Sequence, residues 1–161
     1  MGKLEVQGII VLSMVLLASL GSADQSGSGS SLKARLSGDE EVPAVQTQAR
    51  GEAKFELTEA ADGLTYSIII ENIENVTSAE IHQGRRGENG PPVVELFVEP
   101  KKENINGTLL AEGKIEPYLL TGPLKGQSLC CLVQLMETGE TYLTIQTQNH
   151  PDGEIRGQII K

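Results

Sequence analysis

Aromatic residues are scarce in this sequence, and cysteine is almost absent. The 161 residues include no Trp, two Phe and three Tyr, so a core must be built mainly from Ile, Val, Leu and Ala. The two cysteines, Cys130 and Cys131, are adjacent and cannot close a stabilising loop. Stability is therefore expected to come from packing. The pair can form a vicinal disulfide, an intermolecular bridge or two buried thiols, and we expect buried thiols because unpaired cysteine is often buried.

Histidine is equally scarce, which limits the catalytic chemistry open to the chain. His82 and His150 are the only histidines, no Gly-x-Ser-x-Gly sequence occurs, and the cysteines lie in an apolar segment. These residues supply no convincing nucleophile with an adjacent base. We therefore expect a protein that is not an enzyme and that uses no cofactor.

Positive charge is the third shortage. The chain has 13 basic and 22 acidic residues, which gives a formal net charge of -9. A charge of this sign repels phosphate backbones and anionic lipid surfaces. Nucleic acid is therefore not an expected partner.

Only one long hydrophobic run is present, and it lies near the start of the chain. Residues 8–20 (GIIVLSMVLLASL) form an uncharged run of 13 residues, which is too short to cross ~30 Å of hydrocarbon as a helix. Small residues at 21–23 follow, as signal peptidase requires. We expect residues 1–23 to be a signal peptide, with an uncleaved anchor as the alternative. The mature chain would be secreted or extracellular, or periplasmic or on the cell surface in a prokaryote, with no membrane span.

The remaining sequence divides into a spacer and one domain. Residues 24–31 (DQSGSGSS) are rich in Gly and Ser, which is typical of a flexible spacer. Residues 32–161 are enough for one core of ordinary size and too few for two. We therefore expect a single domain over 32–161.

Short alternating segments predict that this domain is all-β. In residues 51–58 (GEAKFELT) apolar side chains occupy one face and charged side chains the other, as a half-buried strand requires. A turn at 61–63 would join this segment to a partner strand. The pattern predicts an antiparallel, Greek-key-like β-sandwich or barrel of about eight strands. The expected strands are residues 32–36, 51–58, 64–71, 76–82, 93–98, 109–115, 141–147 and 154–160.

One segment has helical rather than alternating spacing. Its apolar residues are Leu129, Leu132, Val133 and Met136. Ser128 is placed to cap the start and Gly139 lies just beyond the end. We expect one short helix over 128–137, with a strand as the alternative, because periodicity alone cannot type short apolar runs.

A group of polar residues around His82 raises the question of a metal site. Residues two apart on a strand point the same way, so Glu80 and His82 would share one site, and Gln146 would join them from a neighbouring strand. His82, Glu80 and His150 are the alternative metal ligands. We prefer a structural role without metal, in which His82 hydrogen-bonds across the edge of the sandwich and fixes the loop 83–92.

Further candidate binding residues lie in that loop and near the end of the chain. Asn89 belongs to a turn-forming Asn-Gly-Pro sequence. Arg85 and Arg86 are expected to be solvated, with an anion or partner contact as the alternative. Arg156 is expected to anchor the closing strand through an ion pair or hydrogen bonds. The candidate binding residues are therefore His82, Arg85, Arg86, Asn89 and Arg156.

Two sequons are glycosylation candidates if a eukaryote secretes the chain. They are Asn75-Val76-Thr77 and Asn106-Gly107-Thr108, which would carry glycans at Asn75 and Asn106.

Several short groups of residues form a pattern that extends over most of the chain. They are Leu36-Ser37-Gly38, Glu41-Val42-Pro43, Gly51, Ala53, Phe55, Ala79, Ile81-His82, Gly84, Gly87, Asn89-Gly90-Pro91, Tyr142, Asn149, Pro151 and Gly153-Glu154-Ile155-Arg156-Gly157-Gln158. In this order and spacing they resemble the CHRD domain, a module first recognised in the extracellular protein chordin. The resemblance implies an all-β, sandwich-like extracellular module. We expect a secreted, non-enzymatic domain that binds an extracellular protein or a matrix component.

The sequence departs from the family pattern at two histidine positions. Glu80-Ile81-His82 stands where the family usually has His-Ile-His, and Gln146-Thr147 stands where a family histidine precedes Thr. The family histidines resemble the paired ligands of copper-zinc superoxide dismutase, another Greek-key β protein. The resemblance therefore offers an alternative function, a metal-binding protein with a degenerate site of that kind.

Overall fold

A computed structural model of the chain describes residues 31–98 and 108–161. The proposed signal peptide, all but the last residue of the spacer, and Asn106 lie outside the described residues. The strands are β1 (Leu32–Ser37), β2 (Arg50–Leu57), β3 (Leu64–Glu71), β4 (Val76–Gln83), β5 (Pro92–Val98), β6 (Thr108–Ile115), β7 (Thr141–Thr147) and β8 (Ile155–Gln158). The helices are α1 (Leu129–Glu137) and the short 3-10 segments η1 (Gly38–Glu40), η2 (Pro117–Leu119) and η3 (Gly122–Leu124).

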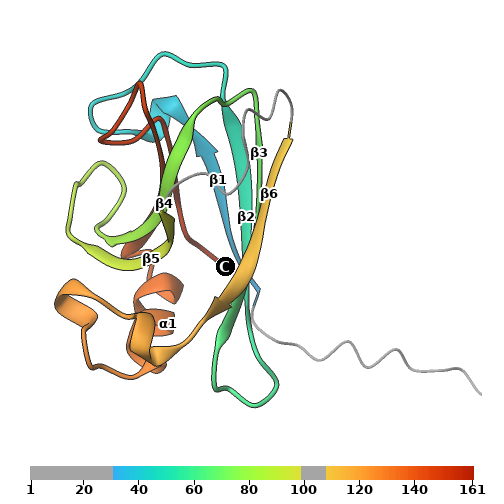
Figure 1. Ribbon diagram of the computed structural model, residues 1–161. Helices are drawn as coiled ribbons and strands as arrows, with labels where there is room; N and C mark the ends of the chain where they lie inside the picture. Colours follow the sequence, from blue (N-terminus) through green and yellow to red (C-terminus); the bar gives the residue numbers. More distant parts are fainter. Residues whose placement is uncertain (1–30, 99–107) are drawn as a thin grey trace, which may run out of the picture.

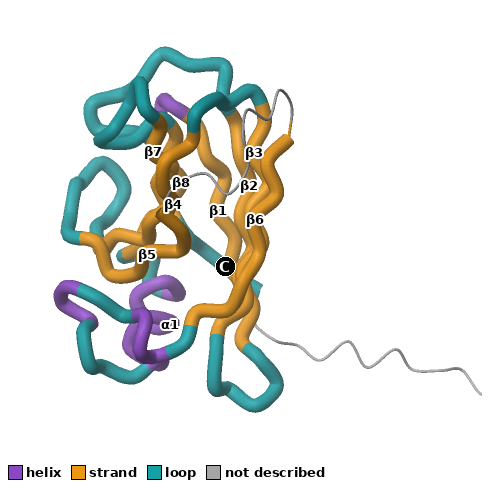
Figure 2. Tube along the Cα trace, viewed as in Figure 1, coloured by secondary structure: helices purple, strands orange, loops and turns teal. Residues whose placement is uncertain are grey.

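All strand pairs are antiparallel, and they form one curved sheet with the order β5-β4-β7-β8-β1-β2-β3-β6. The sheet folds over so that β4, β5, β7 and β8 face β1, β2, β3 and β6 (Figures 1 and 2). The Tyr66 hydroxyl on β3 donates to the carbonyl of Leu96 on β5 at 3.3 Å, and Val94 bridges to Leu120 just after β6. The result is a nearly closed barrel or sandwich with one helix, which confirms the predicted fold class.

Alternation of side chains explains why these strands form. In β1, Leu32, Ala34 and Leu36 are buried, while Lys33 and Arg35 are exposed. Every second side chain of a strand faces the interior, so apolar residues of both layers meet in one core. Apart from Phe55, Met136 and Tyr142, the buried apolar residues are Leu, Ile, Val and Ala, which confirms the predicted aliphatic core.

The helix forms where the sequence predicted it, but the prediction of two buried thiols is wrong. Leu129, Leu132 and Met136 turn one face of α1 into the core. Cys130 is exposed and Cys131 is half-buried, and neither is in a disulfide. Helical periodicity places Cys130 away from the buried stripe, and this outweighs the general tendency of cysteine to be buried.

The strand boundaries agree closely with the predicted ones, except at the end of the chain. β8 ends at Gln158 rather than at Ile160, which makes a single bridge to Lys33. Gly139 follows α1 with a φ of 68°, and its N–H donates to the carbonyl of Met136, as expected of a helix end. Ser128 precedes the helix, but its side chain makes no capping hydrogen bond. Over the described ranges, we find no helix of the length and hydropathy needed to cross a membrane.

Candidate functional site

The connection between β4 and β5, residues 84–91, is held by side chains of β4 and β8, of which Arg156 and Gln158 are buried. We call it the β4–β5 loop. Four of its carbonyl groups, those of Gly84, Arg85, Glu88 and Gly90, accept hydrogen bonds from side chains of β4 and β8. Arg156 and Gln158 are buried, so their N–H groups would lose their acceptors if the loop moved, at a cost of about 1–3 kcal/mol for a buried group left unpaired.

Arg156 of β8 is the centre of this support. Its side chain is 1% exposed, and Nη2 donates to the carbonyls of Arg85 (3.1 Å) and Glu88 (2.7 Å). Nη1 donates to Oδ1 of Asn89 at 3.0 Å. The guanidinium also lies 3.4 Å from the centroid of the Tyr142 ring, which stabilises a desolvated cation. Arg156 is hydrogen-bonded, as predicted, but it anchors the β4–β5 loop rather than the closing strand.

His82 fixes the other end of the loop. Its Nδ1 donates to the carbonyl of Gly90 at 2.8 Å, and its Nε2 lies 2.9 Å from Oε2 of Glu80. The imidazole stacks on Tyr142, with ring centroids 5.2 Å apart. The Tyr142 hydroxyl accepts the N–H of Gly90 at 3.2 Å. These contacts agree with the structural role that we expected of His82.

Gln158 and Asn89 complete the support. Gln158 Nε2 lies 2.8–2.9 Å from the carbonyl oxygens of Gly84, Gly139 and Thr141, so its two N–H groups are shared among three acceptors. Asn89 Nδ2 donates to the carbonyl of Val42 at 2.7 Å. The loop is therefore tied to β8, to the end of α1 and to the segment after η1.

The loop backbone leaves no space for a side chain at Gly90. A Cβ there would lie 1.7 Å from the carbonyl oxygen of Gln83. Gly87, at the tip, has a φ of 82°, a conformation that glycine adopts without strain. Glycine is thus required at position 90 by the close approach of the Gln83 carbonyl, and at position 87 by the positive φ of the turn.

Arg85 and Arg86 point outward from the supported loop. Arg85 pairs with Glu140 at 2.7 Å, and Arg86 pairs with Glu40 at 2.8 Å, both at exposed positions. Exposed ion pairs contribute only about 0–1 kcal/mol, so a ligand can compete for these guanidinium groups at little cost. The site thus combines a fixed backbone with two exposed cations.

A row of polar side chains extends from His82 along β4 and β7. Ser78 and Gln146 are paired across the two strands, and the Ser78 hydroxyl donates to the Gln146 amide oxygen. Gln146 Nε2 donates to Oε2 of Glu80 at 3.3 Å. The structure therefore brings Glu80, His82 and Gln146 together, as the sequence predicted.

The structure does not bring His150 into this row. His82 is opposite Tyr142 at one end of the β4–β7 ladder, whereas His150 follows Thr147 at the other end and bonds to it through its backbone. Five residues of strand span about 16 Å, so His150 cannot share a ligand set with His82.

The residues in the row do not fit a transition-metal site. Both ring nitrogens of His82 are already used by a carbonyl and a carboxylate, and Gln is a poor ligand for zinc or copper. Within residues 31–98 and 108–161, no three His, Cys, Asp or Glu side chains are grouped to hold a metal ion.

Two buried carboxylates lie under the neighbouring loops. Glu41 is 8% exposed and accepts the Thr144 hydroxyl at 2.8 Å. Burial raises the pKa of Glu41, while the Thr144 hydrogen bond and the electrostatic effect of Arg156 and His82 partly offset the increase. Glu154 accepts hydroxyls from Thr47 and Thr147 at 2.7 and 2.8 Å. Neither carboxylate is left without a hydrogen-bond donor.

Tyr142, Gln158 and Glu41 are site residues that the sequence analysis missed. Arg156 and Gln158 are two apart, so the period that grouped Glu80 with His82 would also have grouped them. Tyr142 can be recognised as a site residue only from the strand register, which places it opposite His82. The sequon residue Asn75 is half-buried, with a φ of 52°.

Comparison with known protein families finds one match, the CHRD domain, over residues 32–159. No curated protein and no solved structure matches the chain. The matched range includes every strand, the helix and the whole support of the β4–β5 loop. The resemblance that the sequence analysis noted is thereby confirmed, and the chain belongs to the CHRD domain family.

Proposed function

We propose that the chain is an exported, non-enzymatic binding module that contacts an extracellular protein or matrix component through its β4–β5 loop. The observation that supports this most strongly is that side chains of β4 and β8, with Arg156 and Gln158 buried, donate to four loop carbonyls. Binding residues are commonly presented by loops on a rigid scaffold. A loop fixed in advance also pays less ordering entropy when a partner binds.

The polar residues of the site favour binding over catalysis. His82, Arg156 and Gln158 direct their donors at loop carbonyls, whereas a catalytic set would direct them at a substrate position. The metal-binding alternative gains no support, because the side chains grouped around His82 do not form a suitable ligand set.

Capture of partners from the extracellular fraction of the source organism tests this proposal. Immobilised wild-type domain is compared with an Arg85→Ala/Arg86→Ala variant and with Lys114→Ala/Lys125→Ala, which removes the same charge at exposed positions away from the loop. We expect wild type and control to retain the same partner and the loop variant to lose about tenfold in affinity, since rim charges tune association. A partner retained equally by all three, or no partner from repeated captures, contradicts the proposal.

A further inference from the structure

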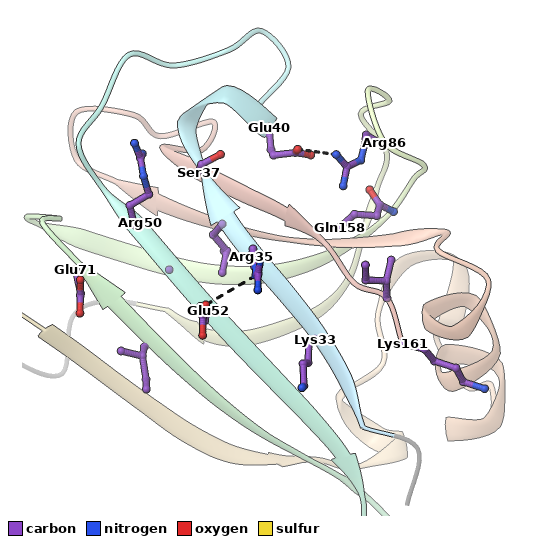
Figure 3. A pocket seen from close by; sticks show the side chains of 14 residues that line it. Lys33, Arg35, Ser37, Glu40, Arg50, Glu52, Glu71, Arg86, Gln158 and Lys161 are labelled. Atoms are coloured by element: carbon purple, nitrogen blue, oxygen red, sulfur yellow. Dashed lines mark hydrogen bonds and ion pairs between the residues drawn. The ribbon is translucent and has the colours of Figure 1, made fainter.

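A groove of about 860 Å³ crosses the outer face of β1 and β2, beside the C-terminus and the tip of the β4–β5 loop (Figure 3). Its basic lining residues are Lys33, Arg35, Arg50, Arg86 and Lys161. These are five of the 13 Lys and Arg residues in a chain whose net charge is -9. Only three acidic residues line the groove, so its lining is net positive on a strongly acidic molecule.

Two of the five cations have no carboxylate partner within the part of the chain that the structure describes. Lys33 makes no ion pair there, and Arg50 bonds only to the carbonyl of Ala49, at 3.0 Å. A third, Arg35, is 3.9 Å from Glu52, which is at the limit of an ion pair. Positive charge in the groove is therefore incompletely neutralised by the protein itself.

The ladder beneath the groove contains one pair of like charges, whereas Arg35 and Arg50 lie opposite Glu52 and Glu71. Lys33 on β1 is directly across from Lys54 on β2, an arrangement that destabilises a sheet. Lys54 is compensated by Glu56 at 2.5 Å, whereas Lys33 turns into the groove. An anionic ligand in the groove would supply the negatively charged partner that Lys33 lacks.

The form of the groove indicates an extended ligand held mainly by charge. It lies on the face of β1 and β2, whereas the sheet edges are β5 and β6. A peptide strand could therefore not gain backbone hydrogen bonds by extending the sheet there. None of the described lining residues is aromatic, so a neutral sugar would find no ring to stack on. Ile69 and Ile160, each about half exposed, offer apolar contacts between the cations.

We propose that this groove binds an anionic polysaccharide, whose repeated negative charges match cations spread over several elements. The choice of a polysaccharide rests on the proposed export, because matrix and cell-surface polymers of this chemistry are extracellular. Arg86 lines the groove and also belongs to the β4–β5 loop, so the two surfaces adjoin. The charged group can be a sulfate or a carboxylate, and the experiment separates the two.

Titration of the purified domain with heparin, with polygalacturonate and with poly-L-glutamate, at low ionic strength, tests the proposal. The variant is Lys33→Gln/Arg50→Gln, and the control is Lys114→Gln/Lys125→Gln, which changes the net charge equally outside the groove. We expect wild type and control to bind one or both polysaccharides alike. The groove variant should bind about tenfold more weakly, with a smaller dependence of affinity on salt, because fewer counterions are released.

Binding of heparin alone would assign sulfate as the ligand group, and binding of polygalacturonate alone would assign carboxylate. Poly-L-glutamate binding as tight as that of either polysaccharide would assign the groove to an acidic protein segment and overturn the proposal. Equal loss in variant and control, or no binding to either polysaccharide, would also overturn it. The titration involves no partner captured by the β4–β5 loop, so its failure leaves the loop proposal intact, and the reverse holds equally.

Discussion

At the scale of single residues, the site depends on hydrogen bonds that side chains of β4 and β8 make to the loop. Arg156 supplies donors to three acceptors of the β4–β5 loop, and His82 supplies one to Gly90. A hydrogen bond contributes about 0.5–1.5 kcal/mol to stability, but a buried donor that loses its acceptor, as Arg156 would, costs about 1–3 kcal/mol. The loop conformation therefore depends more on avoiding this loss than on any one attraction.

Replacing Arg156 with lysine should be costly although the charge is kept. Lysine cannot reproduce the planar fork that reaches Arg85, Glu88 and Asn89 together. We expect Arg156→Lys to lower the free energy of unfolding by roughly 2–4 kcal/mol, measured by urea denaturation, and to increase hydrogen exchange in the loop. The same change at exposed Arg85 should cost less than about 0.5 kcal/mol. Equal effects at the two positions would refute the role assigned to Arg156.

Part of this site could be predicted from the sequence, because part of it is local. Side chains two residues apart on a strand point the same way, which predicted that Glu80 lies beside His82. The turn-forming residues after His82 predicted the loop that it supports. Tyr142 lies between His82 and Arg156, and its position depends on the register of β4 with β7. Register between distant strands is set by the packing of the whole core, so no local pattern could reveal this contact.

At the scale of elements, most strand bounds could be predicted from local pattern. The bounds of β3, in which buried and exposed residues alternate over most of the strand, agree fully with the prediction. Those of β7 also agree, although six of its seven residues are buried, because turn residues flank it on both sides. β8 was predicted two residues too long at its C-terminal end, because Ile159 and Ile160 continue the apolar pattern although only a single bridge follows the strand. Its neighbour on one side is β1, which it approaches closely at Gly157.

Gly157 should be sensitive to the smallest side chain. A Cβ there would lie 2.2 Å from the carbonyl oxygen of Arg35 on β1, and backbone cannot move aside cheaply. We expect Gly157→Ala to reduce stability by about 1–3 kcal/mol or more, measured by the urea midpoint. Gly63→Ala is the matched control, because its Cβ would meet only the flexible Lys114 side chain. A cost at Gly157 no greater than that at Gly63 would show that the β1–β8 contact can relax.

At the scale of the whole molecule, charge is distributed unevenly. The net charge of -9 correctly describes the chain, yet five cations meet in one groove. Composition adds charges over all faces and hides this segregation. The groove arises because β1 and β2 present alternate residues outward while the loop and the C-terminus approach from the side. The position of the groove therefore depends on the topology and cannot be predicted from the composition.

The stability of the whole domain should depend on pH through Glu41, whose burial couples the segment after η1 to β7. Burial raises the pKa of Glu41 above its ordinary value of 4.5, so the folded chain retains a proton that the unfolded chain has lost. The resulting stabilisation is complete below the ordinary value and is lost as the pH rises through the raised pKa. Glu41→Gln should therefore gain in stability relative to wild type as the pH rises from about 4 to about 7, measured by urea denaturation at each pH.

Thr144→Val provides a second, opposite test of the same coupling. The Thr144 hydroxyl donates to Glu41 and lowers its pKa, so its removal should raise that pKa further. The pH at which the domain loses this stabilisation should then move upward relative to wild type. The shift must vanish when Glu41→Gln is also present, because no titrating group remains at that position. A shift that persists in the double variant would place the pH dependence elsewhere in the molecule.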